Sequence, residues 1–219
     1  MKTVSFGVTV GPAQLEGELH VAANAIGIVL FAHGSGSSRH SPRNPYVARA
    51  LRERALGTLL VDLLTMKEEQ VDALNGHFRF DISLLADRLA GIIDWLHGEP
   101  VTRMLPIGLF GASTGAGAAL VAASVRPAQV KAVVSRGGRP DLAGPALPSV
   151  NAPALLIVGG DDTLVIELNR QAMAQMRTEV RLAIVPHASH LFEEPGALEQ
   201  VAALAGDWFE RFLPAEQRG

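Results

Sequence analysis

The chain has 219 residues and a formal net charge of −3, so it carries no basic field that would attract nucleic acid or an anionic membrane. It contains no cysteine, which excludes disulfides, a thiolate nucleophile and a cysteine-bound metal. No apolar run approaches the roughly 20 residues that span a bilayer. Residues 1–7 lack the basic start and apolar run of a signal peptide, so we expect a cytoplasmic protein.

Apolar segments alternate with helical patterns along the chain. Two antiparallel strands, 3–10 and 15–21, flank a turn at Gly11-Pro12. We expect further strands at 26–32, 58–63, 105–110, 130–135, 154–158 and 180–185, and helices at 46–55, 80–97, from 113 to about 126, 164–176 and 198–213. Residues 65–79 are polar and contain Asn75-Gly76, so we expect a loop there.

This alternation predicts one α/β domain over residues 1–219, with an eight-stranded, mostly parallel sheet and helices on both faces. Hydrophobic residues make up 48% of the chain, which is enough to fill the core of such a domain. About 18 residues separate Ser135 from Ala154, many of them Gly and Pro, which leaves no room for a helical cap domain. We therefore expect an open site. The pattern does not determine the oligomeric state.

The most informative stretch is Gly111-Ala112-Ser113-Thr114-Gly115, which lies between an apolar strand and an Ala-rich helix. A strand that turns directly into a helix through Gly-x-Ser-x-Gly is typical of the nucleophile elbow of α/β-hydrolases. The turn needs small residues on both sides of Ser113 and raises its hydroxyl above the sheet. The sequence therefore predicts Ser113 as a nucleophile.

An acid and a base follow in the order of a hydrolase triad. Asp161 and Asp162 come directly after the strand at 154–158, and His187 and His190 come after the last strand. Each pair leaves two alternatives that composition does not separate.

Residues before the elbow supply a candidate oxyanion hole. The strand at 26–32 runs into a small-residue loop, where these enzymes place one of two backbone donors. We assign the donors to the N–H of Thr114 and to that of Ser35, with Gly34 as the alternative to Ser35.

Nearly the whole chain resembles the dienelactone-hydrolase-like family of α/β-hydrolases, some members of which are fused to a phosphoribosyltransferase domain. The matching segments are residues 33–44 (HGSGSSRHSPRN), 111–115 (GASTG), 135–141 (SRGGRPD), 158–162 (VGGDD) and 190–196 (HLFEEPG). The resemblance implies Asp162 as the acid and His190 as the base. True dienelactone hydrolases use cysteine where this chain has Ser113, so their substrate is not implied.

Four arginines, Arg39, Arg43, Arg136 and Arg139, lie on loops at the carboxyl ends of strands, the edge where α/β sheets bind ligands. Guanidinium groups match carboxylates and phosphates, so Arg39, Arg43 and Arg136 are candidates for binding an anionic substrate. The alternative is structural pairing with Asp81, Asp141, Glu193 or Glu194.

These residues predict serine-based acyl transfer to water on a small ester-type substrate: a carboxylic ester, a lactone or a thioester. The chemistry needs no cofactor, and no His, Asp or Glu cluster has metal-ligand spacing. Two alternatives remain. One is an acyltransferase or cofactor-free perhydrolase on the same triad. The other is a non-catalytic module that binds a small molecule or a partner.

Overall fold

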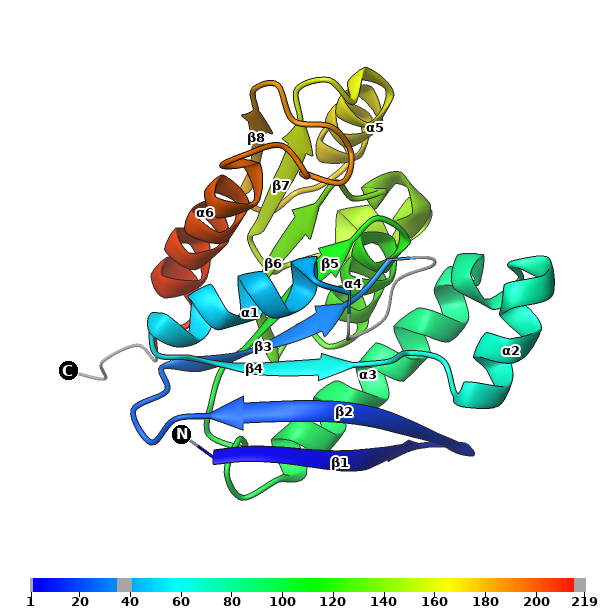
Figure 1. The fold of residues 1–219 in the computed structure, drawn as a ribbon, viewed down its shortest axis with the longest axis vertical. Helices are drawn as coiled ribbons and strands as arrows, with labels where there is room; N and C mark the ends of the chain where they lie inside the picture. Colours follow the sequence, from blue (N-terminus) through cyan, green and yellow to red (C-terminus); the bar gives the residue numbers. More distant parts are fainter. Residues whose placement is uncertain (1, 35–40, 215–219) are drawn as a thin grey trace.

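The computed structural model describes residues 2–34 and 41–214, which fold around an eight-stranded sheet (Figure 1). The strands lie in the order β1-β2-β4-β3-β5-β6-β7-β8. Their bounds are β1 Lys2–Val10, β2 Ala13–Val21, β3 Gly27–Ala32, β4 Leu56–Val61, β5 Ile107–Ala112, β6 Val130–Arg136, β7 Ala154–Gly159 and β8 Val180–Val185. β2 is antiparallel to β1 and β4, and all other neighbours are parallel, as predicted.

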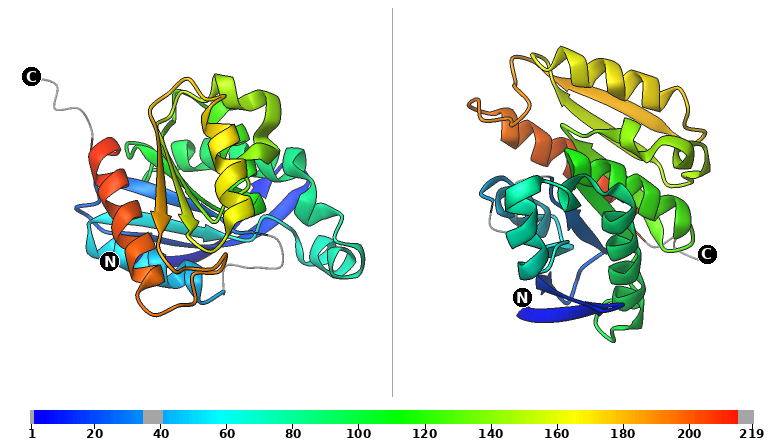
Figure 2. Two further views of the ribbon diagram at one scale, coloured as in Figure 1. Left: turned by 90° about the horizontal axis from the view of Figure 1, so that it is seen from above. Right: turned by 90° about the vertical axis from the view of Figure 1, so that its right-hand side faces the viewer.

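Helices cover both faces of the sheet (Figure 2). Their bounds are α1 Arg43–Glu53, α2 Met66–Asn75, α3 Ile82–Gly98, α4 Thr114–Val125, α5 Thr163–Met173 and α6 Ala197–Phe212, with 3-10 segments η1 Phe78–Phe80 and η2 Pro140–Ser149. α1 and α6 pack on one face, whereas α3, α4 and α5 pack on the other. The central strands β3, β5 and β7 are buried along their whole length, because both of their faces are covered.

The prediction of a loop at residues 65–79 is wrong. The chain forms α2 there, followed by η1, and Figure 1 shows α2 set off beyond the carboxyl end of β4. Met66, Val71 and Leu74 of α2 are all exposed, so the helix has no continuous buried stripe that periodicity could reveal. Its ends are instead fixed by capping. Thr65 and Glu68 form a capping box, and Gly76 ends the helix in the left-handed conformation.

The connection from β6 to β7 contains only η2, which packs against α4 and α5. This confirms the prediction that no cap domain is inserted after Ser135. No helix in the described ranges is both long and apolar enough to cross a membrane.

Gly91 shows how closely α3 packs under the β1–β2 hairpin. A Cβ built on Gly91 would overlap Val10 Cγ1 and lie 3.2 Å from Val10 Cβ. Gly98, in the same helix, has nothing within 4 Å of such a Cβ. One glycine is therefore required by packing, and the other is not.

We expect Gly91→Ala to destabilise the protein by about 1–3 kcal/mol through overpacking, despite the better helix propensity of alanine. Gly98→Ala is the matched control and should be neutral or slightly stabilising. Urea unfolding of both variants measures the difference. Val10→Ala should recover part of the loss in the double variant, and strictly additive effects would contradict the proposed contact.

The capping box predicts a local effect at α2. Thr65→Ala removes the acceptor for the Glu68 N–H and should cost about 1 kcal/mol. The amides of the first turn of α2 should then exchange faster with solvent, whereas those of α3 should not. Thr65→Ser keeps the hydroxyl and should restore protection. Equal exchange in both variants would show that the cap does not hold this helix.

Candidate active site

Ser113 occupies a strained turn between β5 and α4. Its φ of 50° and ψ of −123° lie in a region that L-residues rarely adopt, which costs on the order of 1–3 kcal/mol. The residue is half-buried and directly precedes the first turn of α4, whose N-terminal N–H groups favour negative charge. The backbone geometry is that of the predicted elbow.

The glycines flanking Ser113 are required by close backbone contact. A Cβ on Gly111 would overlap Ala116 in the first turn of α4. A Cβ on Gly115 would lie 2.6 Å from the carbonyl oxygen of His33 and still closer to that of Ala32. These contacts confirm the prediction that larger side chains would collide at this turn.

Asp162 and His190 come together at the same edge of the sheet. Asp162 precedes α5, after β7, and His190 lies on the loop after β8. The Nδ1–H of His190 donates to Asp162 Oδ2 over 2.6 Å. Their alternatives, Asp161 and His187, are exposed. The geometry therefore favours Asp162 and His190 from the two pairs that the sequence left open.

The segment at the end of β6 lies between Ser113 and His190. The N–H of Ser113 donates to the carbonyl oxygen of Arg136 over 3.3 Å, and the N–H of Arg139 donates to the carbonyl oxygen of Ser113 over 3.0 Å. Gly137, between them, has φ +50°, and a Cβ there would lie 3.6 Å from His190 Cε1. The hydrogen bonds of the described residues do not include one between Ser113 Oγ and His190 Nε2.

Asn169 was missed by sequence reasoning, although it supports this loop. It is fully buried in α5, and its amide donates to the carbonyl oxygens of Gly138 and Val165. Its position on the same face as Val165, Ile166 and Ala172 was the available signal, because a polar residue on an apolar stripe needs an internal partner.

Only part of the predicted oxyanion hole lies within the described residues. Thr114 is buried at the start of α4, and Gly34 packs against Ser113, since a Cβ on it would lie 2.8 Å from Ser113 Cβ. Ser35 and Arg39 lie outside the described residues. His33 fixes the end of β3, because its Nε2 accepts from the Leu63 N–H over 3.3 Å.

The other three arginines differ in their partners. Arg139 binds Asp141 through two guanidinium nitrogens, and this hydrogen bond raises the pKa of Arg139, so its charge is compensated within the protein. Arg43 begins α1 and binds Glu193 at 3.1 Å. Arg136 is only 8% exposed, and none of the ion pairs of the described residues involves it.

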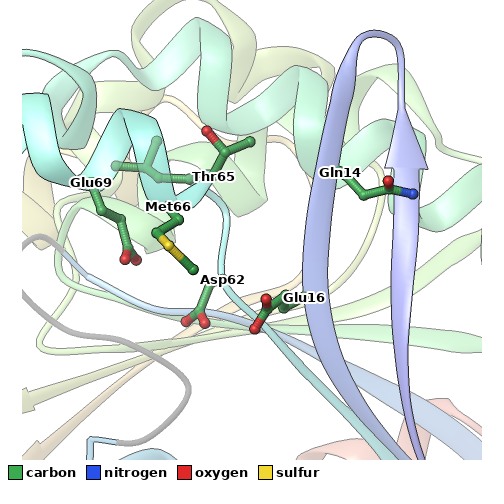
Figure 3. Close-up of a pocket in the computed structure, with 7 residues that line it drawn as sticks. Gln14, Glu16, Asp62, Thr65, Met66 and Glu69 are labelled. Carbon is green, nitrogen blue, oxygen red and sulfur yellow. The ribbon is translucent and has the colours of Figure 1, made fainter.

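A pocket lies beside the carboxyl end of β4 (Figure 3), which is separated in the sheet from β5 by β3. It is lined by Gln14, Glu16, Asp62, Leu64, Thr65, Met66 and Glu69. Three of these are carboxylates, and His33 Nε2 is 3.6 Å from Asp62 Oδ1, so the pocket adjoins the end of β3. No group of three or more His, Cys, Asp or Glu suited to a metal occurs in residues 2–34 and 41–214.

Several known proteins are similar to this chain in sequence or in fold. The chain is similar to dienelactone hydrolase from Anabaena variabilis ATCC 29413, with 59% identity, a TM-score of 0.95, and coverage of 97% of this chain and 98% of that one. It also resembles an α/β serine hydrolase without a lid from Xanthomonas campestris at a TM-score of 0.77, covering 98% of this chain and 96% of that one; at 20% identity this shows the fold alone.

Two curated relatives from Mycobacterium tuberculosis, in strains CDC 1551 and H37Rv, are provisionally named phosphoribosyl transferases. Each is 58% identical over 202 residues, which covers 92% of this chain but 45% of the relative. The chain thus spans less than half the length of these relatives. The model of the dienelactone hydrolase family matches residues 64–214, more than half of the chain. With the 59% identical relative, this match shows that the chain belongs to the dienelactone hydrolase family.

Proposed function

We propose that the protein is a serine hydrolase that cleaves small ester-type substrates through an acyl-enzyme on Ser113. The observation that carries this proposal is the Asp162–His190 hydrogen bond at the sheet edge where Ser113 occupies its strained turn. Ser113 follows β5, Asp162 follows β7 and His190 follows β8, so the three residues lie at the carboxyl edge of one parallel sheet and are of the types that nucleophilic acyl transfer needs. Family membership supports hydrolysis as the reaction class.

In the proposed reaction, His190 Nε2 takes the proton of Ser113 Oγ as that oxygen attacks the acyl carbon. Asp162 accepts from Nδ1–H, so it holds the tautomer that leaves Nε2 free and stabilises the imidazolium. The alcohol leaves with the proton from His190. Water, deprotonated by His190, then attacks the acyl-enzyme, which releases the acid and restores Ser113.

Backbone N–H groups stabilise the tetrahedral intermediates in this scheme. The N–H of Thr114 lies at the start of α4, and the second donor is Ser35, with Gly34 as the alternative. One such donor is typically worth about 3 kcal/mol in the transition state. Ser113 and His190 need to approach each other for proton transfer, and hydrogen bonds of this kind often tighten only when substrate is bound.

The name of the mycobacterial relatives does not transfer to this chain, because more than half of each relative lies outside the matched region. An acyltransferase or perhydrolase would use the same acyl-enzyme with another acceptor in place of water. A binding module would form no acyl-enzyme at all. Labelling with a fluorophosphonate separates these classes, because only an activated serine reacts.

We expect a fluorophosphonate to label Ser113 in the wild-type protein and not to label Ser113→Ala. A screen of small esters, thioesters and lactones should then show release of the free acid into water. Labelling without hydrolysis would indicate transfer to another acceptor. Absence of labelling in the folded protein would leave only the binding module.

Substitutions of the acid and the base are compared with the same substitutions at the nearby residues Asp161 and His187. Asp162→Asn should lower kcat by about four powers of ten, because it reverses the hydrogen bond that sets the imidazole tautomer. Asp161→Asn should have little effect, and His190→Ala should nearly abolish turnover, whereas His187→Ala should not. Steady-state kinetics with one ester measures all four variants. A severe Asp161→Asn variant beside a mild Asp162→Asn variant would refute the assignment.

A further inference from the structure

Arg136 lies immediately beside the proposed nucleophile. It is the last residue of β6, pairs with Ala112 across the sheet, and accepts the N–H of Ser113 at its carbonyl oxygen. Side chains alternate along a strand, so Arg136 shares the face of Val134, which packs with α1 and α6. Arg43, the first residue of α1, lies at the same edge on that face.

Two nitrogens of the Arg136 side chain are buried, and no ion pair among residues 2–34 and 41–214 involves it. The side chain is 8% exposed, and its Nε and Nη1 are buried with no hydrogen-bond partner. Burying a cation is costly unless an anion and hydrogen bonds compensate it, and native proteins rarely leave such groups unsatisfied. Burial and, to a smaller extent, the neighbouring Arg43 lower the pKa of Arg136 to about 10.

Arg43 supplies a second, partly available guanidinium. Its Nη1 binds Glu193, an exposed side chain on the loop that carries His190, but its Nε is buried with no partner. Glu193 therefore holds Arg43 in place and leaves other N–H groups of that side chain unused. Phe192 closes the space near Gly137, since a Cβ on Gly137 would lie 3.3 Å from Phe192 Cε2.

We propose that Arg136 and Arg43 form a subsite for a phosphate monoester group carried by the substrate. The proposal rests on the proposed function, because Ser113 sets where the ester bond must lie. A phosphate monoester has up to two negative charges and three oxygens that accept hydrogen bonds, which suits two guanidinium groups from the same edge of the sheet. A carboxylate offers one charge and two oxygens, so it would leave more of these N–H groups unpaired.

The phosphate itself takes no part in the reaction. Water cleaves only the carboxylic ester bond, so the products are the acid and the alcohol, and one of them keeps the intact phosphate group.

Selectivity among matched esters tests the subsite. The first series varies the alcohol: it carries a phosphate in 2-acetoxyethyl phosphate, a carboxylate in 3-acetoxypropanoate and no charge in 2-methoxyethyl acetate. The second series varies the acyl part in the same way, with the methyl esters of 3-phosphonooxypropanoic, succinic and butanoic acids. In one of the two series, we expect kcat/KM to be on the order of ten- to a hundredfold higher for the phosphate than for the neutral ester. The carboxylate should fall between them.

Substitutions assign this preference to the arginines. In Arg136→Met and Arg43→Met, the phosphate-to-neutral ratio of kcat/KM should fall towards one, and Arg136→Lys should retain part of it. The ratio cancels any general loss of activity. Arg126→Met is the matched control, since Arg126 binds Asp94 on the helical surface and should leave the ratio unchanged. An unchanged ratio in Arg136→Met, or an equal or greater preference for the carboxylate, would overturn the proposal.

Binding tests the subsite independently of catalysis. Phenyl phosphate should bind the full-length wild-type protein at least tenfold more tightly than benzoate in calorimetric titrations, and Arg136→Met should lose this difference. If Ser113 is not labelled but phenyl phosphate still binds through Arg136, the proposed function fails and the subsite stands. If Ser113 is labelled and phenyl phosphate does not bind, the subsite fails alone. Thermal unfolding of each variant confirms that it is folded.

Discussion

The close approach of β3, β5 and the start of α4 is the constraint on which the site depends. Gly115 has no side chain, so the first turn of α4 can pack against the carbonyl oxygens of Ala32 and His33. This contact holds Ser113 in its positive φ and aims the N-terminus of α4 at the space above it. Strain of this kind persists only where the surrounding structure fixes it from several sides.

The remaining parts of the site lie on loops that are connected by hydrogen bonds and an ion pair. The turn from Arg136 to Arg139 binds both backbone polar groups of Ser113, and Asn169 anchors that turn to α5. The loop after β8 carries His190 and is tied to α1 through Glu193 and Arg43. These contacts restrain the backbone of Ser113 and the loop that carries His190, although both connections are short.

Much of the fold could be predicted from the sequence, because the central strands are apolar on both faces and alternate with amphipathic helices. The predictions failed at α2, where capping by Thr65 and Gly76 defines the helix and no buried stripe marks it. In the site, Gly-x-Ser-x-Gly indicated Ser113, because its small residues are a steric requirement of the turn. Spacing could not choose between Asp161, which is exposed, and Asp162, which accepts the hydrogen bond of His190.

The ion-pair partners of the arginines also could not be predicted from the sequence. Arg139 and Asp141 are two residues apart, but Arg43 and Glu193 are 150 residues apart and meet only through tertiary folding. Burial of a charged side chain, as at Arg136, likewise depends on elements distant in the chain. Sequence patterns locate charges along an edge, whereas packing decides which of them remain unpaired.

The short η2 connection has a consequence for how selectivity can arise. In enzymes with a lid, the binding energy of the correct substrate drives closure of the lid. A wrong substrate does not drive this movement, so closure adds to the selectivity. A β6-to-β7 connection made of 3-10 turns packed against α4 and α5 offers no such moving element. Any discrimination that this connection contributes must then come from its fixed shape and fixed charge.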